Sequence, residues 1–136
     1  MGEILVAYDE SELAKKALNR AIQLMKEGDE LIILYVIPTP LLKEFADLEP
    51  DQTLAKGREL VNKEVTELQK RKIKAIGVVR QGSIAEEILR FSKELDCDMI
   101  IMGSRGKGHE KVSPFVLGSV TETVIRNSAC PVLIVK

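Results

Sequence analysis

The stretch LIILYVI, residues 31–37, decides the fold that the sequence predicts. An uninterrupted apolar run of this kind indicates a β-strand buried on both faces, which is typical of a parallel sheet. The four other runs with strand character are ILVAY 4–8, IKAIGVVR 73–80, MIIM 99–102 and VLIV 132–135. We expect the run at 73–80 to be an edge strand, because Lys74 and Gly77 interrupt its apolar pattern.

Helical periodicity fills the gaps between these strands. The segments with apolar residues at helical spacing are 13–25, 52–71, 84–95 and 119–128. We expect Gly28 to end the first helix, and two Ser-x-x-Glu spacings predict capping boxes at Ser83 and Ser119. Five strands that alternate with four helices predict an α/β fold, with one domain over residues 1–136. Its parallel sheet is expected to lie between two layers of helices.

The composition excludes several classes of partner. With 20 basic and 21 acidic residues the net charge is −1, so no overall field attracts nucleic acid or an anionic membrane. No apolar run is long enough to span a membrane, and the N-terminus lacks a signal-peptide pattern, so we expect a cytoplasmic protein. Cys97 and Cys130 do not have the spacing of a zinc or disulfide motif, and we expect both to be buried and reduced.

A glycine-rich loop follows the fourth strand. Its glycines and cations are Gly103, Arg105, Gly106, Lys107 and Gly108. Glycine lets backbone N–H groups approach a ligand closely, so we expect this loop to bind phosphate, with Arg105 among the contacting residues. The loop is not a Walker A motif, since His109 and Glu110 stand where that motif needs Lys and Ser or Thr. As a lone loop histidine, His109 is expected to be solvated.

Two other segments are expected to complete a nucleotide site. Gly118 and Ser119 open the last helix, whose start offers N–H groups and a positive dipole to a phosphate. Asp9 follows the first strand, where a carboxylate suits ribose hydroxyls or a Mg²⁺ ion shared with phosphates. In open parallel sheets ligands bind beyond the carboxyl ends of the strands. The apolar strand-end residues that can enclose a base there are Ala7, Val36 and Met102.

At these residues the chain resembles the universal stress protein family, and the similarity covers essentially all of it. The stretches that carry the resemblance are ILVAYDESELAKKAL, LIILYVI, QGSIAEEIL, DMIIMGSRGKG and LGSVTETVIRNSACPVLIVK. The resemblance implies a five-stranded parallel sheet of Rossmann-like strand order 3-2-1-4-5, as in the adenine-nucleotide alpha-hydrolase fold. ATP-binding members of that family carry GxxG, a spacer, and a glycine followed by Ser or Thr.

Carried over to this sequence, the family pattern implies a set of ATP contacts. The phosphate and ribose contacts that it implies are Gly103, Gly106, Gly118, Ser119 and Val120. The nucleoside contacts that it implies are Ala7, Asp9, Val36 and Met102. The chain departs from the pattern in two places. The eleven-residue spacer from Lys107 to Leu117 is longer than usual, and Glu10 replaces the usual glycine between Asp9 and Ser11.

The last strand is expected to join two copies of the chain. The resemblance implies a homodimer through this strand, which consists of Val132, Leu133, Ile134 and Val135. Independently, the strand would be an exposed apolar edge in a monomer, and proteins seldom leave such an edge uncovered.

The sequence is compatible with more than one function. The leading hypothesis is an ATP-binding stress-response or signalling module that is at most a slow ATPase, because no catalytic constellation faces the expected phosphates. The alternative is a stress-family dimer that binds no nucleotide and acts as a protein-interaction scaffold, through its dimer surface or segment 38–51. A phospho-acceptor domain is disfavoured because the segment after the third strand, VVRQGS 78–83, has no aspartate. Flavin binding is disfavoured because the turn after the first strand is acidic.

Overall fold

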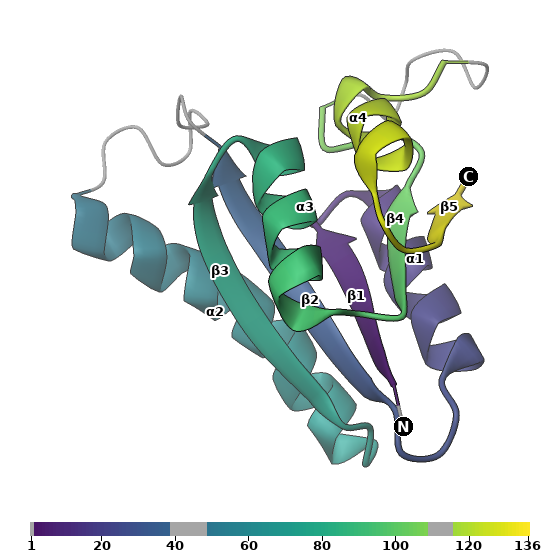
Figure 1. The fold of residues 1–136 in the computed structure, drawn as a ribbon. Helices are drawn as coiled ribbons and strands as arrows, with labels where there is room; N and C mark the ends of the chain where they lie inside the picture. Colours follow the sequence, from purple (N-terminus) through teal and green to yellow (C-terminus); the bar gives the residue numbers. More distant parts are fainter. Residues whose placement is uncertain (1, 39–48, 109–115) are drawn as a thin grey trace.

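The computed structural model describes residues 2–38, 49–108 and 116–136. The elements in these ranges are β1 Glu3–Tyr8, α1 Glu12–Leu24, β2 Glu30–Pro38, α2 Pro50–Lys70, β3 Ala75–Gly82, α3 Ile84–Leu95, β4 Met99–Gly103, α4 Ser119–Asn127 and β5 Val132–Val135. The strands form one parallel sheet in the order β3-β2-β1-β4-β5 (Figure 1). The predicted α/β fold and strand order are confirmed, and β3 lies at an edge as expected.

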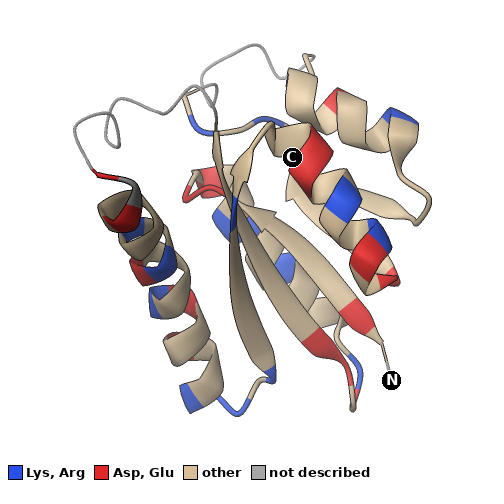
Figure 2. Cartoon of the chain, turned by 60° about the vertical axis from the view of Figure 1, so that its left-hand side comes forward, with Lys and Arg blue, Asp and Glu red and all other residues tan. Residues whose placement is uncertain are grey.

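The sheet is the middle of three layers. α1 and α2 pack on one face, and α3 and α4 cover the other (Figure 1). Every residue of the stretch 31–37 is buried, because β2 lies between two strands and is covered on both faces. Figure 2 shows the consequence for charge, since the strands are mostly uncharged and the charged residues lie on helices and turns.

β1 lies next to the point where the strand order reverses. On one side Ala7 pairs with Leu34 of β2, and on the other Val6 pairs with Ile101 of β4. Ligands of open parallel sheets bind beyond the carboxyl ends of the strands at such a point. The segments that follow β1 and β4 therefore meet at one end of the sheet.

α1 is shorter than the sequence predicts. It ends at Leu24, whereas Gly28 was expected to end it. The Asp29 carboxylate accepts the N–H of Lys26 at 2.8 Å and closes a separate turn after the helix. Gly28 lies in that turn with a φ of 92°, so its left-handed conformation serves the turn and not the helix end.

The two expected capping boxes are wrong. α3 begins after Ser83, but the Ser83 hydroxyl makes no hydrogen bond to the first turn of the helix. α4 has Gly118 as its N-cap, so Ser119 is already inside the helix and cannot cap it. A reciprocal contact forms instead at the start of α2, where the Gln52 side chain accepts the N–H of Glu49 at 3.0 Å.

Some expectations fall outside the described residues. They concern residues 39–48, the middle of segment 38–51 through which a scaffold was expected to act, and His109 with the spacer residues up to 115. Within the part of the chain that is described, no helix combines the length and the apolar character that a membrane crossing needs.

Candidate functional site

A cavity of about 410 Å³ opens at the carboxyl ends of β1, β2 and β4. This volume lies in the range of small-molecule and cofactor sites, roughly 300–1,000 Å³. The structure brings all ten of the expected ligand-contacting residues to its wall: Ala7, Asp9, Val36, Met102, Gly103, Arg105, Gly106, Gly118, Ser119 and Val120. Residues that are far apart in the sequence therefore form one site.

The start of α4 is joined to the loop after β4. The Gly118 N–H donates to the Ser104 carbonyl at 2.8 Å, and the Thr121 hydroxyl donates to the Gly103 carbonyl at 3.0 Å. A Cβ atom at position 118 would lie 3.3 Å from the Arg105 Cα, so glycine allows the two backbones to approach this closely. The two phosphate-binding arms that the sequence predicts are thus held together before any ligand binds.

The first turn of α4 leaves backbone donors at the cavity. Its N-cap is a glycine, which has no side chain to accept a hydrogen bond from the turn. The N–H groups of the first turn, at Ser119, Val120 and Thr121, have no acceptor within the helix, and the helix dipole makes this end positive. All three residues line the cavity. This arrangement suits an anion such as a phosphate.

Gly103 and Gly106 each leave room for a different neighbouring residue. Gly103 is the last residue of β4, and a Cβ atom there would lie 2.7 Å from the Leu13 Cβ. The glycine at 103 therefore permits close packing of α1 against β4. A Cβ atom at Gly106 would lie 2.9 Å from Asp9 Oδ2, so this glycine lets the loop approach the Asp9 carboxylate.

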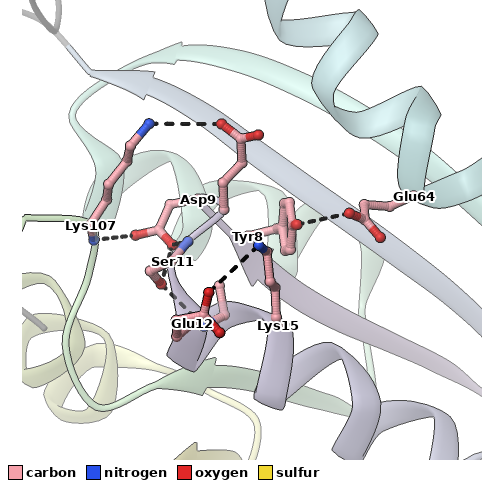
Figure 3. A network of polar contacts seen from close by, with 9 residues as sticks. Tyr8, Asp9, Ser11, Glu12, Lys15, Glu64 and Lys107 are labelled. Atoms are coloured by element: carbon pink, nitrogen blue, oxygen red, sulfur yellow. Dashed lines mark hydrogen bonds and ion pairs between the residues drawn. The ribbon is translucent and has the colours of Figure 1, made fainter.

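Asp9 connects the two loops at the mouth of the cavity (Figure 3). Its Oδ1 accepts hydrogen bonds from the Ser11 N–H at 3.0 Å and the Ser11 hydroxyl at 2.6 Å, and its Oδ2 accepts the Lys107 N–H at 2.7 Å. A carboxylate has about four lone-pair sites, so acceptor capacity remains for a ribose hydroxyl. Among the described residues no group of three or more His, Cys, Asp or Glu side chains could hold a metal ion.

Glu10 occupies a backbone conformation that favours glycine. Its φ is 68°, in the left-handed region. Its carboxylate lies 3.7 Å from the Lys107 ammonium, across the same gap that Asp9 bridges. The departure from the family pattern at this position is therefore accommodated as a strained residue with an ion pair.

The apolar part of the cavity extends beyond the residues that the sequence identified. Val36 and Met102 are largely buried, with 8% and 5% of their surface exposed, yet both border the cavity. The apolar residues that the sequence analysis missed include Leu34, Ile84, Ile88, Val116 and Leu117. Ile84 and Ile88 lie one turn apart at the start of α3, and their helical periodicity marked them as core.

Tyr8 links the cavity wall to α2. Its hydroxyl donates to the Glu64 carboxylate at 3.0 Å (Figure 3). Burial and the neighbouring Glu64 carboxylate raise the pKa of the Tyr8 phenol well above its usual range. The phenol therefore stays a neutral hydrogen-bond donor at physiological pH, and its bond to Glu64 holds the end of β1 against α2.

Comparisons with known proteins give the chain a family and structural neighbours. The family model described as the universal stress protein family matches residues 1–136. Universal stress protein Sll1388 of Synechocystis sp. is 35% identical, with 99% of this chain and 97% of that protein covered. The solved structure of MJ0577 from Methanocaldococcus jannaschii is 31% identical with a TM-score of 0.70, and 99% of this chain and 95% of that one are covered.

A more distant neighbour was solved with a nucleotide. It is a universal stress protein family member from Arabidopsis thaliana with AMP bound, 17% identical with a TM-score of 0.73, and 100% of this chain and 92% of that one are covered. At this identity the likeness shows the fold alone.

Proposed function

The chain belongs to the universal stress protein family, and from this we propose that it is an ATP-binding module of a stress response or signalling pathway. The observation that carries the proposal is the start of α4, whose N-cap is Gly118 and whose first turn lines a cavity of about 410 Å³. This helix end supplies the donors that a phosphate needs, and the opposite wall supplies apolar surface for a base.

Each part of ATP has a matching part of the wall. The phosphates would accept hydrogen bonds from the first-turn amides of α4, close to the positive charge of Arg105. The ribose would lie near Asp9, and the adenine between Ala7, Val36 and Met102. Mg²⁺ would be held mainly by the phosphates and water, with Asp9 as the one acidic side chain among the described residues that line the cavity.

Turnover of the bound ATP is proposed to be slow or absent. A general base must lie within hydrogen-bond reach of the attacking water and be able to take its proton. Both oxygens of Asp9 already accept hydrogen bonds from Ser11 and Lys107, and the acceptor capacity that remains is the one assigned above to the ribose. The carboxylate is better suited to holding the two loops together.

Calorimetric titration with ATP and Mg²⁺ tests the nucleotide proposal. We expect saturable heat at submillimolar ATP, and AMP should be titrated in parallel because the Arabidopsis thaliana neighbour was solved with it. Heat with AMP but none with ATP would restrict the site to monophosphates. No heat from either nucleotide at millimolar concentration would favour the alternative, a family member that acts as a protein-interaction scaffold.

A homodimer through β5 is part of the proposal. β5 is an edge of the sheet, and its four residues, Val132 to Val135, are only half-buried in the single chain. The carbonyls of Pro131 and Val135 accept hydrogen bonds from the N–H groups of Ile100 in β4 and of Ser104 just after it. By alternation the N–H and C=O of Ile134 therefore point away from the sheet. Light scattering should give twice 15.1 kDa for the native chain and the monomer mass for Ile134→Pro. A monomeric native chain at all concentrations would contradict it.

A further inference from the structure

The two cysteines lie side by side at the end of the sheet opposite the cavity. Cys97 follows α3 and precedes β4, and Cys130 follows α4 and precedes β5. Although they are 33 positions apart, their sulfur atoms are 3.8 Å from each other, and both are free thiols. The sequence spacing indicated no disulfide motif, and the adjacency arises only because β4 and β5 are neighbours in the sheet.

The two thiols differ in access to solvent. Cys97 is buried, with 5% of its surface exposed, whereas Cys130 is half-buried, which corrects the expectation that both would be buried. The Ser128 hydroxyl accepts the Cys130 N–H at 3.2 Å, donates to the Cys130 carbonyl at 2.8 Å and lies 3.4 Å from its sulfur. Burial and the proximity of Cys130 raise the pKa of the Cys97 thiol to about 12. Cys130 is therefore the thiol that a dissolved oxidant reaches first.

We propose that Cys97 and Cys130 are a peroxide-sensitive pair that closes to an intramolecular disulfide. In the first step Cys130 loses its thiol proton and the thiolate attacks one peroxide oxygen. The O–O bond breaks, a sulfenic acid forms, and the leaving hydroxide takes up that proton to become water. In the second step the Cys97 sulfur attacks the Cys130 sulfur, the S–O bond breaks, and the hydroxyl leaves as water with the Cys97 proton. Two thiols and one hydrogen peroxide thus give one disulfide and two waters.

The pair needs only a local movement to react. A disulfide has an S–S distance of about 2.05 Å, so the sulfurs must approach by about 1.8 Å, within reach of a change in side-chain torsion angles. Cys130 lies in the connection between α4 and β5, outside both elements, where such a change disturbs no strand pairing.

The cross-link would close a chain loop that contains part of the candidate site. Residues 97–130 include β4, the glycine-rich loop and α4, so the bond would restrict the unfolded chain without adding contacts at the cavity. We expect the oxidised protein to melt roughly 10 °C higher than the reduced protein. Because both cysteines lie at the amino ends of their strands and the cavity opens at the carboxyl ends of β1, β2 and β4, ATP affinity should be the same in both forms.

The test is oxidation of the reduced full-length chain with excess hydrogen peroxide. We expect both thiols to disappear together, a Cys97–Cys130 peptide in a non-reducing digest, and a rate independent of protein concentration. Methionine oxidation is separated from this reaction because dithiothreitol reverses only the disulfide and the rise in melting temperature. The second step, in which the disulfide closes, should be faster at higher pH, because the Cys97 sulfur reacts as its thiolate.

The control variant is Cys130→Ser, which changes the more exposed residue and leaves the buried one intact. We expect this variant to keep its Cys97 thiol under the same treatment and to show no dithiothreitol-reversible change in melting temperature. The proposal is overturned if the native chain forms only intermolecular disulfides, if Cys130 proceeds to sulfinic acid while Cys97 stays reduced, or if neither thiol reacts until the protein unfolds. These readouts do not depend on nucleotide binding.

Discussion

Two helices, α1 and α4, begin at the wall of the same cavity, and their N-termini are completed in different ways. At α1 the Ser11 hydroxyl accepts the N–H of Ala14 at 3.1 Å, and Glu12 places an acidic group in the first turn. The Asp9 carboxylate then accepts the N–H of Ser11 itself. At α4 the N-cap is Gly118, which has no side chain to do the same.

The difference indicates where an anion would bind. Every helix start has unsatisfied N–H groups and a positive dipole, but at α1 the Ser11 hydroxyl accepts the Ala14 N–H and the Asp9 carboxylate lies beside the N-cap. Each helix also has one glutamate in its first turn that pairs with a basic residue along the helix, Glu12 with Lys15 at 3.7 Å and Glu122 with Arg126 at 2.8 Å, so the contrast lies in the N-cap residue and in Asp9. A phosphate therefore finds donors at α4 and competing acceptors at α1.

The largest effect is expected from blocking the start of α4. In Gly118→Leu a side chain would begin 3.3 Å from the Arg105 Cα and extend into the space beside the first turn. We expect ATP affinity by calorimetry to fall at least about 100-fold, or about 2.7 kcal/mol. Gly118→Ala is the matched variant and should lose less. Circular dichroism must show that both variants are folded, and a folded Gly118→Leu protein with native affinity would contradict the assignment.

A smaller effect is expected from giving α4 the acidic character of α1. Ser119→Asp places a carboxylate in the first turn, where it would both repel a phosphate and accept its donors. ATP affinity should fall by about tenfold, or about 1.4 kcal/mol, while adenosine affinity stays unchanged. The opposite change at α1, Glu12→Gln, should leave ATP affinity within about twofold. Equal losses for ATP and adenosine would mean that the phosphates lie elsewhere.

Removing the side-chain cap of α1 should affect the stability of the fold more than the affinity for ATP. Ser11→Ala removes the hydroxyl that accepts the Ala14 N–H and contacts Asp9, so the free energy of unfolding in urea should fall by about 1 kcal/mol. Ser83→Ala is the control, because Ser83 is also an N-cap but makes no such bond, and its effect should stay within about 0.5 kcal/mol. If both serines cost the same, the hydroxyl contacts seen at α1 are not what stabilises it.

The smallest effect is expected at Glu10, in the turn that leads into α1. Glu10→Gly relieves a φ of 68° but loses an exposed ion pair and makes the unfolded chain more flexible. The net result should be a gain of about 0.5 kcal/mol in the free energy of unfolding. Glu10→Ala loses the same ion pair without the relief and should be less stable than Glu10→Gly. The reverse order would show that the left-handed backbone costs little here.

The sequence predicts those parts of the molecule whose signals are local. The apolar run 31–37 indicated a strand buried on both faces, and the structure confirms this. The glycines of the loop after β4 were expected to let backbone N–H groups approach a ligand, and the structure shows Gly106 beside the Asp9 carboxylate and Gly118 beside the Arg105 backbone. The sequence predicted the N-cap of α4 at Ser119, one residue too late. Ser119 has the residue type of an N-cap, but Gly118 has the extended backbone conformation of one. Only the backbone conformation distinguishes the two.

Other features depend on contacts between distant segments, which periodicity does not report. The Tyr8 bond to Glu64 joins β1 to α2 over 56 positions, and the approach of Cys97 to Cys130 follows from the β4–β5 register. Ile84 and Ile88 have the periodicity of core residues, and only the assembled sheet shows that they also border the cavity.

Amide chemical shifts during an ATP titration test the central claim most directly. In ¹H–¹⁵N spectra we expect ATP to shift the amide signals of Ser119, Val120 and Thr121, with adenosine leaving these three largely unchanged. The Ser11 and Ala14 amides at the start of α1 should respond equally to ATP and adenosine, because Asp9 and the Ser11 hydroxyl already accept their hydrogen bonds and only the ribose is expected near Asp9. Shifts confined to the start of α1, or no shifts at millimolar ATP, would contradict the assignment of the phosphate site to α4.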